Sequence, residues 1–335
     1  MVDPAQKSRI ATLDSLRGLA ILLVLLAHYL APRLDYSGPG YLVSTFGGGG
    51  VLLFFILSGY LITKTRQNLD AGTFLARRLW KLFPAYLGAC FLAIFLIYLT
   101  GKSLPSLREL ACNFTMTQDV FGQPMFSTVF WTLLIEIKFY FLMALFGTLI
   151  PMIPSSVVVL FFFSCNALLY FTYGRGSNLL GFFPVFFIGV AMYRLESKGW
   201  KIKESWDLIA VTFLTSTGIL LFQIENHISN AIFCILWAAI GILVMKLKWQ
   251  SVLLNKLGKI SYSLYLYHTI LGYFLFNWIR LYFHVNSWVA LVLAIPIVLL
   301  ASNLSFCIVE SPCVSLGRHM EGSWKARKNK QCIIS

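Results

Sequence analysis

The stretch Leu13-Asp-Ser-Leu-Arg-Gly-Leu-Ala-Ile-Leu-Leu-Val-Leu-Leu-Ala-His28 decides the fold, because it places an arginine and a histidine inside an apolar run. At about 100° per residue, the eleven steps from Arg17 to His28 return to nearly the same helix face, roughly 16 Å further along the axis. An arginine at the centre of a membrane helix costs roughly 2.5–3.5 kcal/mol on insertion scales. The stretch therefore predicts a membrane-spanning helix with a functional polar face.

The composition is that of a polytopic membrane protein. Hydrophobic residues make up 58% of the 335 residues, charged residues make up 12%, and the mean hydropathy is +0.77. These values lie outside the range of soluble domains. Apolar runs of about 20 residues are long enough to cross a bilayer. The sequence predicts an all-α integral membrane protein with ten transmembrane helices, at residues 13–31, 46–63, 79–99, 130–150, 154–171, 179–193, 208–222, 228–245, 260–281 and 288–309.

The formal net charge of +14 raises the question of a nucleic-acid partner. The basic residues, however, gather at the chain ends and in every second connection between the predicted helices. The remaining connections contain few Lys or Arg residues. By the positive-inside rule, this alternation places both termini in the cytoplasm. The charge therefore predicts topology, with no nucleic-acid partner. The basic groups are Lys7 and Arg9; Lys64, Arg66, Arg77, Arg78 and Lys81; Arg194, Lys198, Lys201 and Lys203; Lys246, Lys248, Lys256 and Lys259; and Arg318, Lys325, Arg327, Lys328 and Lys330.

The chain is expected to form one transmembrane domain, residues 1–320, followed by a basic cytoplasmic tail, residues 321–335. The first apolar segment follows basic residues, as a signal peptide would. It nevertheless contains Arg17 and His28 and lacks a convincing small-residue cleavage site. We therefore expect it to be a retained membrane anchor.

Two short patterns match modification signals. The end of the chain, Cys332-Ile-Ile-Ser335, is a formal prenylation box, and Asn113-Phe-Thr115 is a formal glycosylation site. Both have meaning only in a eukaryotic cell, and ten spans would make a lipid anchor redundant. The seven cysteines show no metal-ligand spacing and no obvious pairing. Most are expected to pack as small apolar residues.

A histidine and a carboxylate are predicted at similar depth. With the first helix running outward, His28 falls in its outer half, and an inward-running helix from residue 130 places Glu136 in the outer half too. A histidine hydrogen-bonded to a carboxylate is a suitable general base, because the carboxylate orients the ring and stabilises the imidazolium. The alternative is an intramembrane pair that only ties two helices together.

A basic, partly apolar segment is predicted at the cytoplasmic interface, over residues 70–83. It has the character of an interfacial amphipathic helix and carries Arg77, Arg78 and Lys81. Clustered guanidinium groups suit phosphates, because their planar fork makes bidentate hydrogen bonds. The alternative is contact with anionic lipid headgroups. Pro84 follows, near the start of the third span, where a proline is tolerated.

The chain resembles the acyltransferase-3 family of integral membrane O-acyltransferases. The resemblance covers nearly all of it and rests on an ordered set of motifs, which is more specific than any one of them. The motifs are Arg17 and His28 with ten residues between them, Gly50-Val-Leu-Leu-Phe-Phe-Ile-Leu-Ser-Gly59, Arg77-Arg-Leu-Trp-Lys-Leu-Phe-Pro84, Trp131 with Glu136 and Phe139-Tyr140, Leu257-Gly-Lys-Ile-Ser-Tyr-Ser-Leu-Tyr-Leu-Tyr-His268, and Val309-Glu-Ser-Pro312.

The resemblance implies transfer of an acyl group, usually acetyl from cytosolic acetyl-CoA, to a sugar hydroxyl. It implies that His28 is the catalytic residue, that Arg17 is its partner, and that an Arg-x-x-Arg motif binds the CoA donor. Here that motif reads Arg78-Leu-Trp-Lys81, and lysine keeps the charge but loses the planar fork. Arg77 is expected to compensate. Direct transfer to the acceptor and a route through acyl-histidine would use the same residues.

Five further residues are weaker candidates. Ser58 belongs to a motif but precedes Gly59, so it could simply permit close helix contact. Lys138 is an intramembrane charge, and His268 follows a run of tyrosines and could be a satisfied interior histidine. Glu310, which is not one of these five, is expected at an interfacial helix terminus. The remaining candidates are Trp131 and Tyr140, and no metal site is predicted.

The predicted function is O-acylation of a surface or envelope glycan, such as lipopolysaccharide O-antigen, in a bacterial inner membrane. The acceptor is a glycan or lipid-linked sugar, membrane lipids are the other partners, and the sequence leaves the oligomeric state open. A transporter or flippase with a path lined by Arg17, His28, Glu136 and Lys138 is the alternative, although no inverted repeat supports it. A structural scaffold would not need these buried charges.

Overall fold

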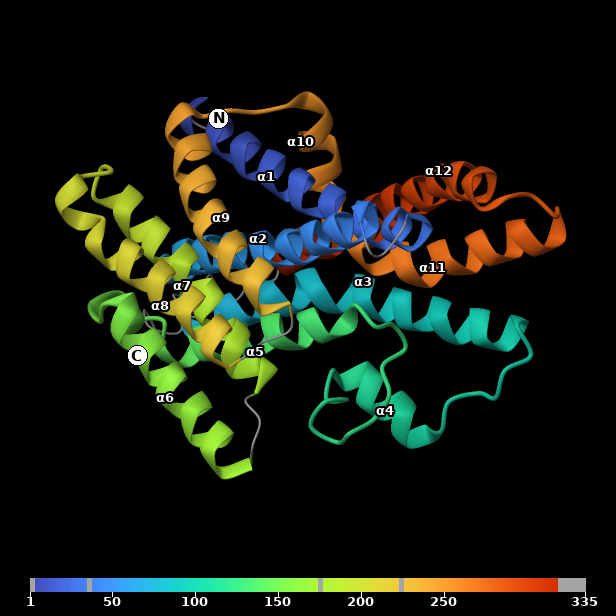
Figure 1. Ribbon diagram of the computed structural model, residues 1–335, viewed down its shortest axis with the longest axis horizontal. Helices are drawn as coiled ribbons and strands as arrows, with labels where there is room; N and C mark the ends of the chain where they lie inside the picture. Colours follow the sequence, from blue (N-terminus) through green and yellow to red (C-terminus); the bar gives the residue numbers. More distant parts are fainter. Residues whose placement is uncertain (1–3, 35–37, 174–176, 223–225, 319–335) are drawn as a thin grey trace, which may run out of the picture. The chain divides into compact units, whose positions relative to one another are not determined.

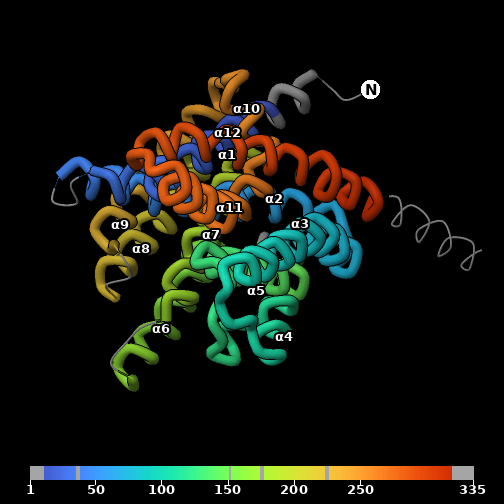
Figure 2. The backbone as a smooth tube through the Cα atoms, turned by 90° about the vertical axis from the view of Figure 1, so that its right-hand side faces the viewer, coloured from blue at the N-terminus to red at the C-terminus, as the bar shows by residue number. Residues whose placement is uncertain are grey.

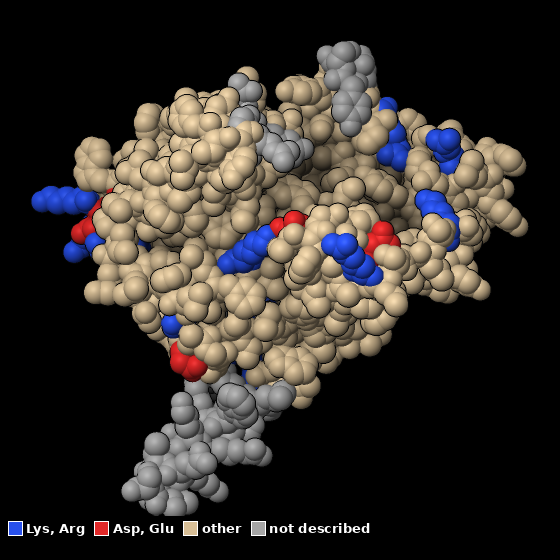
Figure 3. Space-filling view, turned by 90° about the horizontal axis from the view of Figure 1, so that it is seen from below, with Lys and Arg blue, Asp and Glu red and all other residues tan. Residues whose placement is uncertain are grey.

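The computed structural model describes residues 4–34, 38–173, 177–222 and 226–318, and within these ranges all regular structure is helical (Figure 1). The basic tail, Cys332 and His319 lie outside the described residues. On the face seen in Figure 3, charged side chains stand in small separate groups on an otherwise uncharged surface. This agrees with a charged fraction of 12%.

Besides an α-helical segment at residues 311–318, the described residues contain twelve α-helices. They are α1 (Pro4–Tyr29), α2 (Pro39–Gln67), α3 (Ala71–Leu99), α4 (Leu107–Thr115), α5 (Phe130–Phe146), α6 (Ser155–Tyr173), α7 (Asn178–Ser197), α8 (Trp206–Leu221), α9 (His227–Leu247), α10 (Val252–Lys259), α11 (Ser261–Tyr282) and α12 (Ser287–Ser305). A π-helical turn, Phe306–Glu310, follows α12, and short 3-10 turns lie at Ala31–Arg33, Ile150–Met152 and Ile202–Glu204.

Seven helical segments are long and apolar enough to cross a membrane, so the protein is a multi-pass membrane protein. They contain α1, α2, α3, α6, α7, α9 and α12. The other three predicted spans are also helical: α5 has 17 residues, α8 has 16 and α11 has 22. They are not among the seven segments in the described part of the chain. The count of ten spans and the cytoplasmic termini stay predictions.

Helix α3 joins two elements that the sequence suggested were separate. The basic interfacial segment and the third span form one continuous helix of 29 residues, with Pro84 in its interior. Asp70 caps the start of the helix, because its side chain accepts a hydrogen bond of 3.0 Å from the Thr73 amide. Proline interrupts the hydrogen-bond ladder, but apolar helices in membrane proteins tolerate this. Arg77, Arg78 and Lys81 therefore stand on the same rigid rod as the span.

The chain divides into two compact units by its internal contacts. Unit 1 comprises Met1–Asn68 and Ile135–Ser261, and unit 2 comprises Leu69–Leu134 and Tyr262–Ser335. Unit 1 thus contains α1, α2, the greater part of α5, and α6 to α10. Unit 2 contains α3, α4, α12 and nearly all of α11, together with the first turn of α5.

Glycines bring the helices of unit 1 into backbone contact. A Cβ atom on Gly18 of α1 would lie 2.0 Å from the Leu254 carbonyl oxygen of α10, and one on Gly258 would lie 1.8 Å from that of Asp14. The same reciprocal arrangement joins α2 and α7, where Gly59 faces the Phe186 carbonyl at 1.9 Å and Gly189 faces Ile56. Small residues allow such approaches in membrane helices. These crossings hold α1 and α2 against their neighbours.

The glycine run Gly47–Gly50 lets α2 pack against two helices at once. Cβ atoms on Gly47 and Gly50 would lie 2.1 Å from Ala27 Cβ and 2.6 Å from the Ala20 carbonyl oxygen, both on α1. A Cβ on Gly49 would lie 2.8 Å from the Phe233 ring on α9. The Trp237 indole, also on α9, donates a 2.7 Å hydrogen bond to the Gly49 carbonyl. Because residue numbers rise on α2 as they fall on α1, these two helices are antiparallel.

Unit 2 is held together by buried polar contacts and an apolar hairpin. The Tyr86 hydroxyl of α3 donates to the Asn113 carbonyl at 2.8 Å and accepts from Gln118 at 2.9 Å, which fastens the loop around α4 to α3. Ser127 and Thr269 pair at 2.7 Å. Helix α11 lies alongside α12, as Figures 1 and 2 show, and their apolar contact is centred on Ile279, Ala290 and Ala294.

Candidate functional site

Helix α1 carries the two residues that dominate the sequence pattern. Arg17 Nη1 lies 3.8 Å from Asp14 Oδ1, one turn earlier on the same helix, and the two side chains are 18% and 17% exposed. His28 lies in the last turn of α1 and is half-buried. One long ion pair engages little of a guanidinium that has five N–H donors. Asp14 was not among the predicted site residues, although its spacing of three from Arg17 suits a helical pair.

Glu136 is held by two hydroxyl groups. Its Oε1 atom accepts a 2.8 Å hydrogen bond from Ser58 on α2 and a 2.7 Å hydrogen bond from Tyr140, one turn later on α5. Ser58 and Glu136 are half-buried, and Tyr140 is buried. Close helix contact was one interpretation of Ser58 and a polar role was the other. In the structure, Gly59 makes the close helix contact and Ser58 binds the carboxylate.

The contacts between α1 and α2 show which part of α1 lies beside Ser58. Gly50 meets Ala20, Leu23 and Val24 of α1. Ser58 lies eight residues beyond Gly50, or about 12 Å at 1.5 Å per residue, toward the N-terminal end of α1. An equal displacement along α1 ends near residues 12–16, next to Arg17. His28 lies in the opposite direction from this contact.

The same contacts place Ser58 and Arg17 on one side of the α1–α2 pair. At about 100° per residue, Ser58 is turned about 50° from the mean direction of Gly47 and Gly50. Arg17 is turned about 70° in the same rotational sense from the α1 residues that face α2. Antiparallel helices are related by a local twofold axis, so equal senses of rotation lead to the same side. Glu136, bonded to Ser58, therefore belongs to the Arg17 end of this side.

The predicted pairing of His28 with Glu136 stays a prediction, and the hydrogen bonds and helix register do not favour it. Both hydrogen bonds to Glu136 that the described residues supply come from hydroxyls. Lys138, two residues further along α5, is half-buried. His28 and Glu136 would lie at similar depth only if all helices began at one membrane level. The register of α1 against α2 depends instead on where their glycines meet.

Arg66 is a buried cation, although its place in a basic group of the sequence predicts only topology. It is 7% exposed, and its Nε and Nη2 atoms donate to the Met143 and Ala144 carbonyls at 3.1 and 3.4 Å. These carbonyls belong to the last turn of α5, where a cation is favourable. Arg66 therefore fixes the end of the helix that carries Glu136. The sequence around Arg66 could not predict its contact with the last turn of α5, because the partners are 77 and 78 residues away.

The predicted donor-binding cations lie in unit 2. Arg77, Arg78 and Lys81 occupy the first half of α3 and are all half-buried. The Arg78 guanidinium lies 5.7 Å from the centre of the Phe74 ring, so part of its position is set by a cation–π contact. Trp131, in the first turn of α5, is also half-buried.

His268 and Glu310 are both interior residues of unit 2. The His268 ring is fully buried, and its Nδ1 atom donates to the Tyr265 carbonyl at 2.7 Å, as expected for an interior histidine. Glu310 is 4% exposed and accepts a 2.8 Å hydrogen bond from Ser263 on α11. Its expected place at a helix terminus is wrong, because the helix continues after the π-helical turn to residue 318. Such turns are frequent at functional sites.

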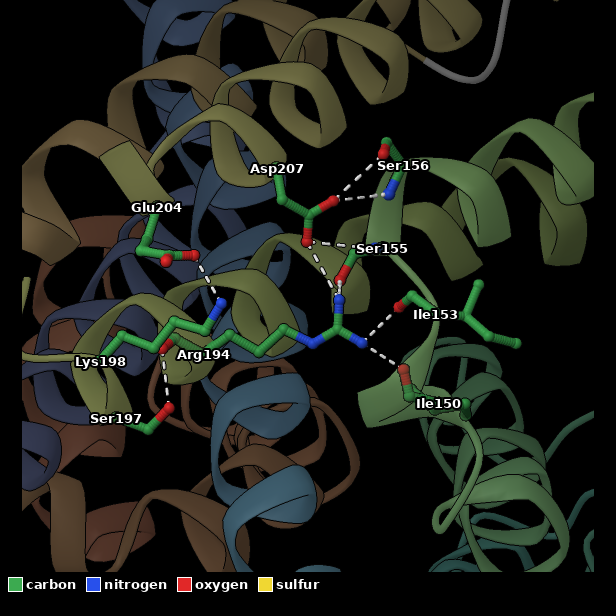
Figure 4. Close-up of polar contacts among 9 residues, drawn as sticks. All are labelled: Ile150, Ile153, Ser155, Ser156, Arg194, Ser197, Lys198, Glu204 and Asp207. Carbon is green, nitrogen blue, oxygen red and sulfur yellow. Dashed lines mark hydrogen bonds and ion pairs between the residues drawn. The ribbon is translucent and has the colours of Figure 1, made fainter. Parts of the chain in front are cut away.

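A network of hydrogen bonds with one ion pair joins α7 to the starts of α6 and α8 (Figure 4). The Arg194 Nη1 atom donates to Asp207 at 3.1 Å and to Ser155 at 3.0 Å, and Nη2 donates to the Ile150 and Ile153 carbonyls. Asp207 accepts the Ser155 and Ser156 amides at 3.1 and 3.0 Å. Burial acts to raise the pKa of Asp207, but these hydrogen bonds and Arg194 outweigh it and hold that pKa below its ordinary value.

The asparagine of the formal glycosylation site is buried in the last turn of α4. Asn113 is 0% exposed, and its side-chain amide donates to the Glu109 and Pro124 carbonyls at 2.9 Å each. Its Oδ1 accepts from Gln118 and from the Phe126 amide. A glycan on this nitrogen would disrupt the loop. Within the described residues, no group of three His, Cys, Asp or Glu side chains has metal-site geometry.

Comparison with known proteins gives a consistent set of matches. The model of a family described as an acyltransferase domain matches residues 10–306. A Komagataeibacter xylinus protein provisionally named membrane-bound transacylase BcsY is 27% identical over 91% of this chain and 83% of its own. Peptidoglycan O-acetyltransferase OatA of Listeria monocytogenes is 29% identical over 39% of this chain and 23% of its own, and acyltransferase MdmB of Streptomyces mycarofaciens is 28% identical over 45% and 42%. No solved structure matches the chain.

Proposed function

Because the chain belongs to the acyltransferase-3 family of integral membrane O-acyltransferases, we propose that it transfers an acetyl group from cytosolic acetyl-CoA to a hydroxyl of an envelope glycan. The observation that carries the proposal is the placement of Arg17 and His28 on one side of α1, both only partly exposed. A relative named for peptidoglycan O-acetylation supports a glycan acceptor. Lipopolysaccharide O-antigen is the acceptor that we propose to test first, and a bacterial inner membrane is the proposed location.

His28 is the proposed general base. Its imidazole takes the proton of the acceptor hydroxyl, and the oxygen attacks the thioester carbonyl of the donor. The carbon–sulfur bond then breaks, and the imidazolium returns the proton to the departing thiolate. The products are the O-acetyl ester and CoA with a free thiol. In the alternative route, His28 itself accepts the acetyl group before the hydroxyl attacks.

The cations of α1 and α3 are the proposed donor site. Arg77, Arg78 and Lys81 are half-buried on one rigid helix, and arginines there suit the phosphates of CoA. Arg17 is proposed to bind a donor phosphate as well. Because Arg17 and His28 are separated by roughly 16 Å along α1, a donor bound at Arg17 must extend its arm toward His28.

Replacement of the proposed base tests the reaction. In membranes supplied with labelled acetyl-CoA, His28→Ala should lower acetyl transfer by about 10²–10⁴-fold with unchanged protein abundance. His227→Ala, at the start of α9, is the matched control and should retain full activity. Full activity of the His28 variant would remove the proposed base. NMR of envelope polysaccharide from cells with and without the protein would identify the acceptor through an O-acetyl resonance.

A further inference from the structure

The Glu136 carboxylate is positioned but incompletely bonded. Ser58 and Tyr140 both donate to Oε1, and these are the hydrogen bonds that the described residues make to this side chain. A carboxylate has two oxygens and about four acceptor sites. Glu136 is also only half-buried. The hydroxyls therefore fix its orientation and leave Oε2 able to accept a further hydrogen bond.

The position of Glu136 lies on the path that the proposed donor must follow. It stands on the same side of the α1–α2 pair as Arg17 and close to Arg17 in height, while His28 lies further along α1. A tie between α2 and α5 would not require a charged group, because a neutral amide could accept from Ser58 and Tyr140. The ion pairs found among the described residues do not include Glu136. The charge of Glu136 is thus available to a ligand.

Acyl-CoA carries N–H groups that could donate hydrogen bonds in this region. Acyl-CoA has phosphates at one end and a thioester at the other, and the pantetheine arm between them carries amide N–H groups. Resting on the proposed function, we propose that Glu136 Oε2 accepts an amide N–H of the pantetheine arm, with Ser58 and Tyr140 holding the carboxylate in place. Glu136 is then a donor-binding residue, and it sets the position of the thioester relative to His28.

A series of donors tests this assignment in the full-length protein in membranes. Acetyl-CoA and S-acetylpantetheine contain the amides, whereas S-ethyl thioacetate contains none. Glu136→Ala should lower kcat/KM by about tenfold or more with the first two donors, because a hydrogen bond to a charged group is lost. With S-ethyl thioacetate, wild type and variant should be equal. Glu196→Gln on α7 is the matched control, since this carboxylate also accepts from a tyrosine, Tyr60, and should show no dependence on the donor.

Two outcomes would overturn the inference. Equal losses with all three donors and unchanged abundance would mean that Glu136 acts on His28. Equal losses with a lowered amount of folded protein would mean that it only ties α2 to α5. If wild-type membranes transfer acetyl from none of the donors, the proposed function itself fails, and that result is distinct from a uniform loss in the variant.

Discussion

The two charged clusters of unit 1 differ in how completely their charges are bonded. Around Arg194 and Asp207, side-chain and backbone groups of three elements engage both ions, and this network joins α6, α7 and α8. Around Arg17 and Glu136, one ion pair of 3.8 Å and two hydroxyls leave much of the bonding capacity unused. Buried polar groups that serve only the fold are usually satisfied within it. The difference indicates a structural role for the first cluster and a ligand for the second.

The largest expected effect is a difference in protein stability between a variant of Arg194 and a variant of Arg17. Arg194→Leu should destabilise the protein by roughly 3 kcal/mol, because it leaves the partly buried Asp207 carboxylate without its cation. Arg17→Leu should change stability by less than about 1 kcal/mol but abolish most acetyl transfer. Thermal unfolding in detergent and activity in membranes would measure the two effects. Equal destabilisation by both variants would break the comparison.

The pH dependence of the Arg194 cluster provides a second test. The lowered pKa of Asp207 means that its carboxylate stabilises the folded state above its ordinary pKa of 3.8, and that this stabilisation is lost as the pH falls through the lower folded value. Asp207→Asn should therefore cost about 2 kcal/mol at pH 7. The gap in melting temperature between variant and wild type should narrow below about pH 4. A gap that is independent of pH would exclude the charge as its cause.

A charge reversal on α3 should affect donor binding. Arg78→Glu is expected to raise the KM for acetyl-CoA by about tenfold while leaving stability nearly unchanged, because the residue is half-buried and phosphate binding would lose a cation. Initial rates over a range of acetyl-CoA concentrations would measure this. An unchanged KM would favour contact with lipid headgroups, and Lys203→Glu, on an exposed turn, is the control for charge alone.

The smallest expected effects concern the hydroxyls around Glu136. Ser58→Ala and Tyr140→Phe should each lower kcat/KM for acetyl-CoA by about threefold to tenfold, since each removes one hydrogen bond to the carboxylate. In a Glu136→Ala background the same changes should have no further effect. Such a double-mutant cycle isolates the coupling between the groups. Additive losses would show that the hydroxyls act independently of Glu136.

The sequence predicted the helices of this protein better than the register in which they pack along one another. Apolar runs identified every helix that could cross the membrane, and the spacing of Arg17 and His28 identified a shared helix face. The partnership of Ser58 with Glu136 could not be predicted, because 78 residues separate them and each motif describes only its own helix. The depth of Glu136 was inferred from the start of its own helix. Its height beside α1, however, depends on glycine contacts between other helices.

Burial was the other quantity that local patterns did not supply. Asn113 matches a modification signal over three residues, yet its amide is enclosed by contacts with residues up to 13 positions away. Glu310 stands before a proline, as a helix-terminal residue would, yet it is buried and the helix continues to residue 318. His268 follows a run of tyrosines, and its ring is fully buried. For Asn113 and Glu310, the hydrogen-bond partners come from outside the motif.

The glycine run of α2 has a consequence for which sequences this protein can tolerate. At Gly47 the nearest atom to a new methyl group would be the Cβ of Ala27, which directly precedes His28. Neither atom has a rotamer through which it can move aside. Alanine at position 47 would therefore shift the main chain of α1 beside the His28 imidazole. Gly47 and Ala27, which contribute no polar side chain, thus limit where the proposed general base can lie.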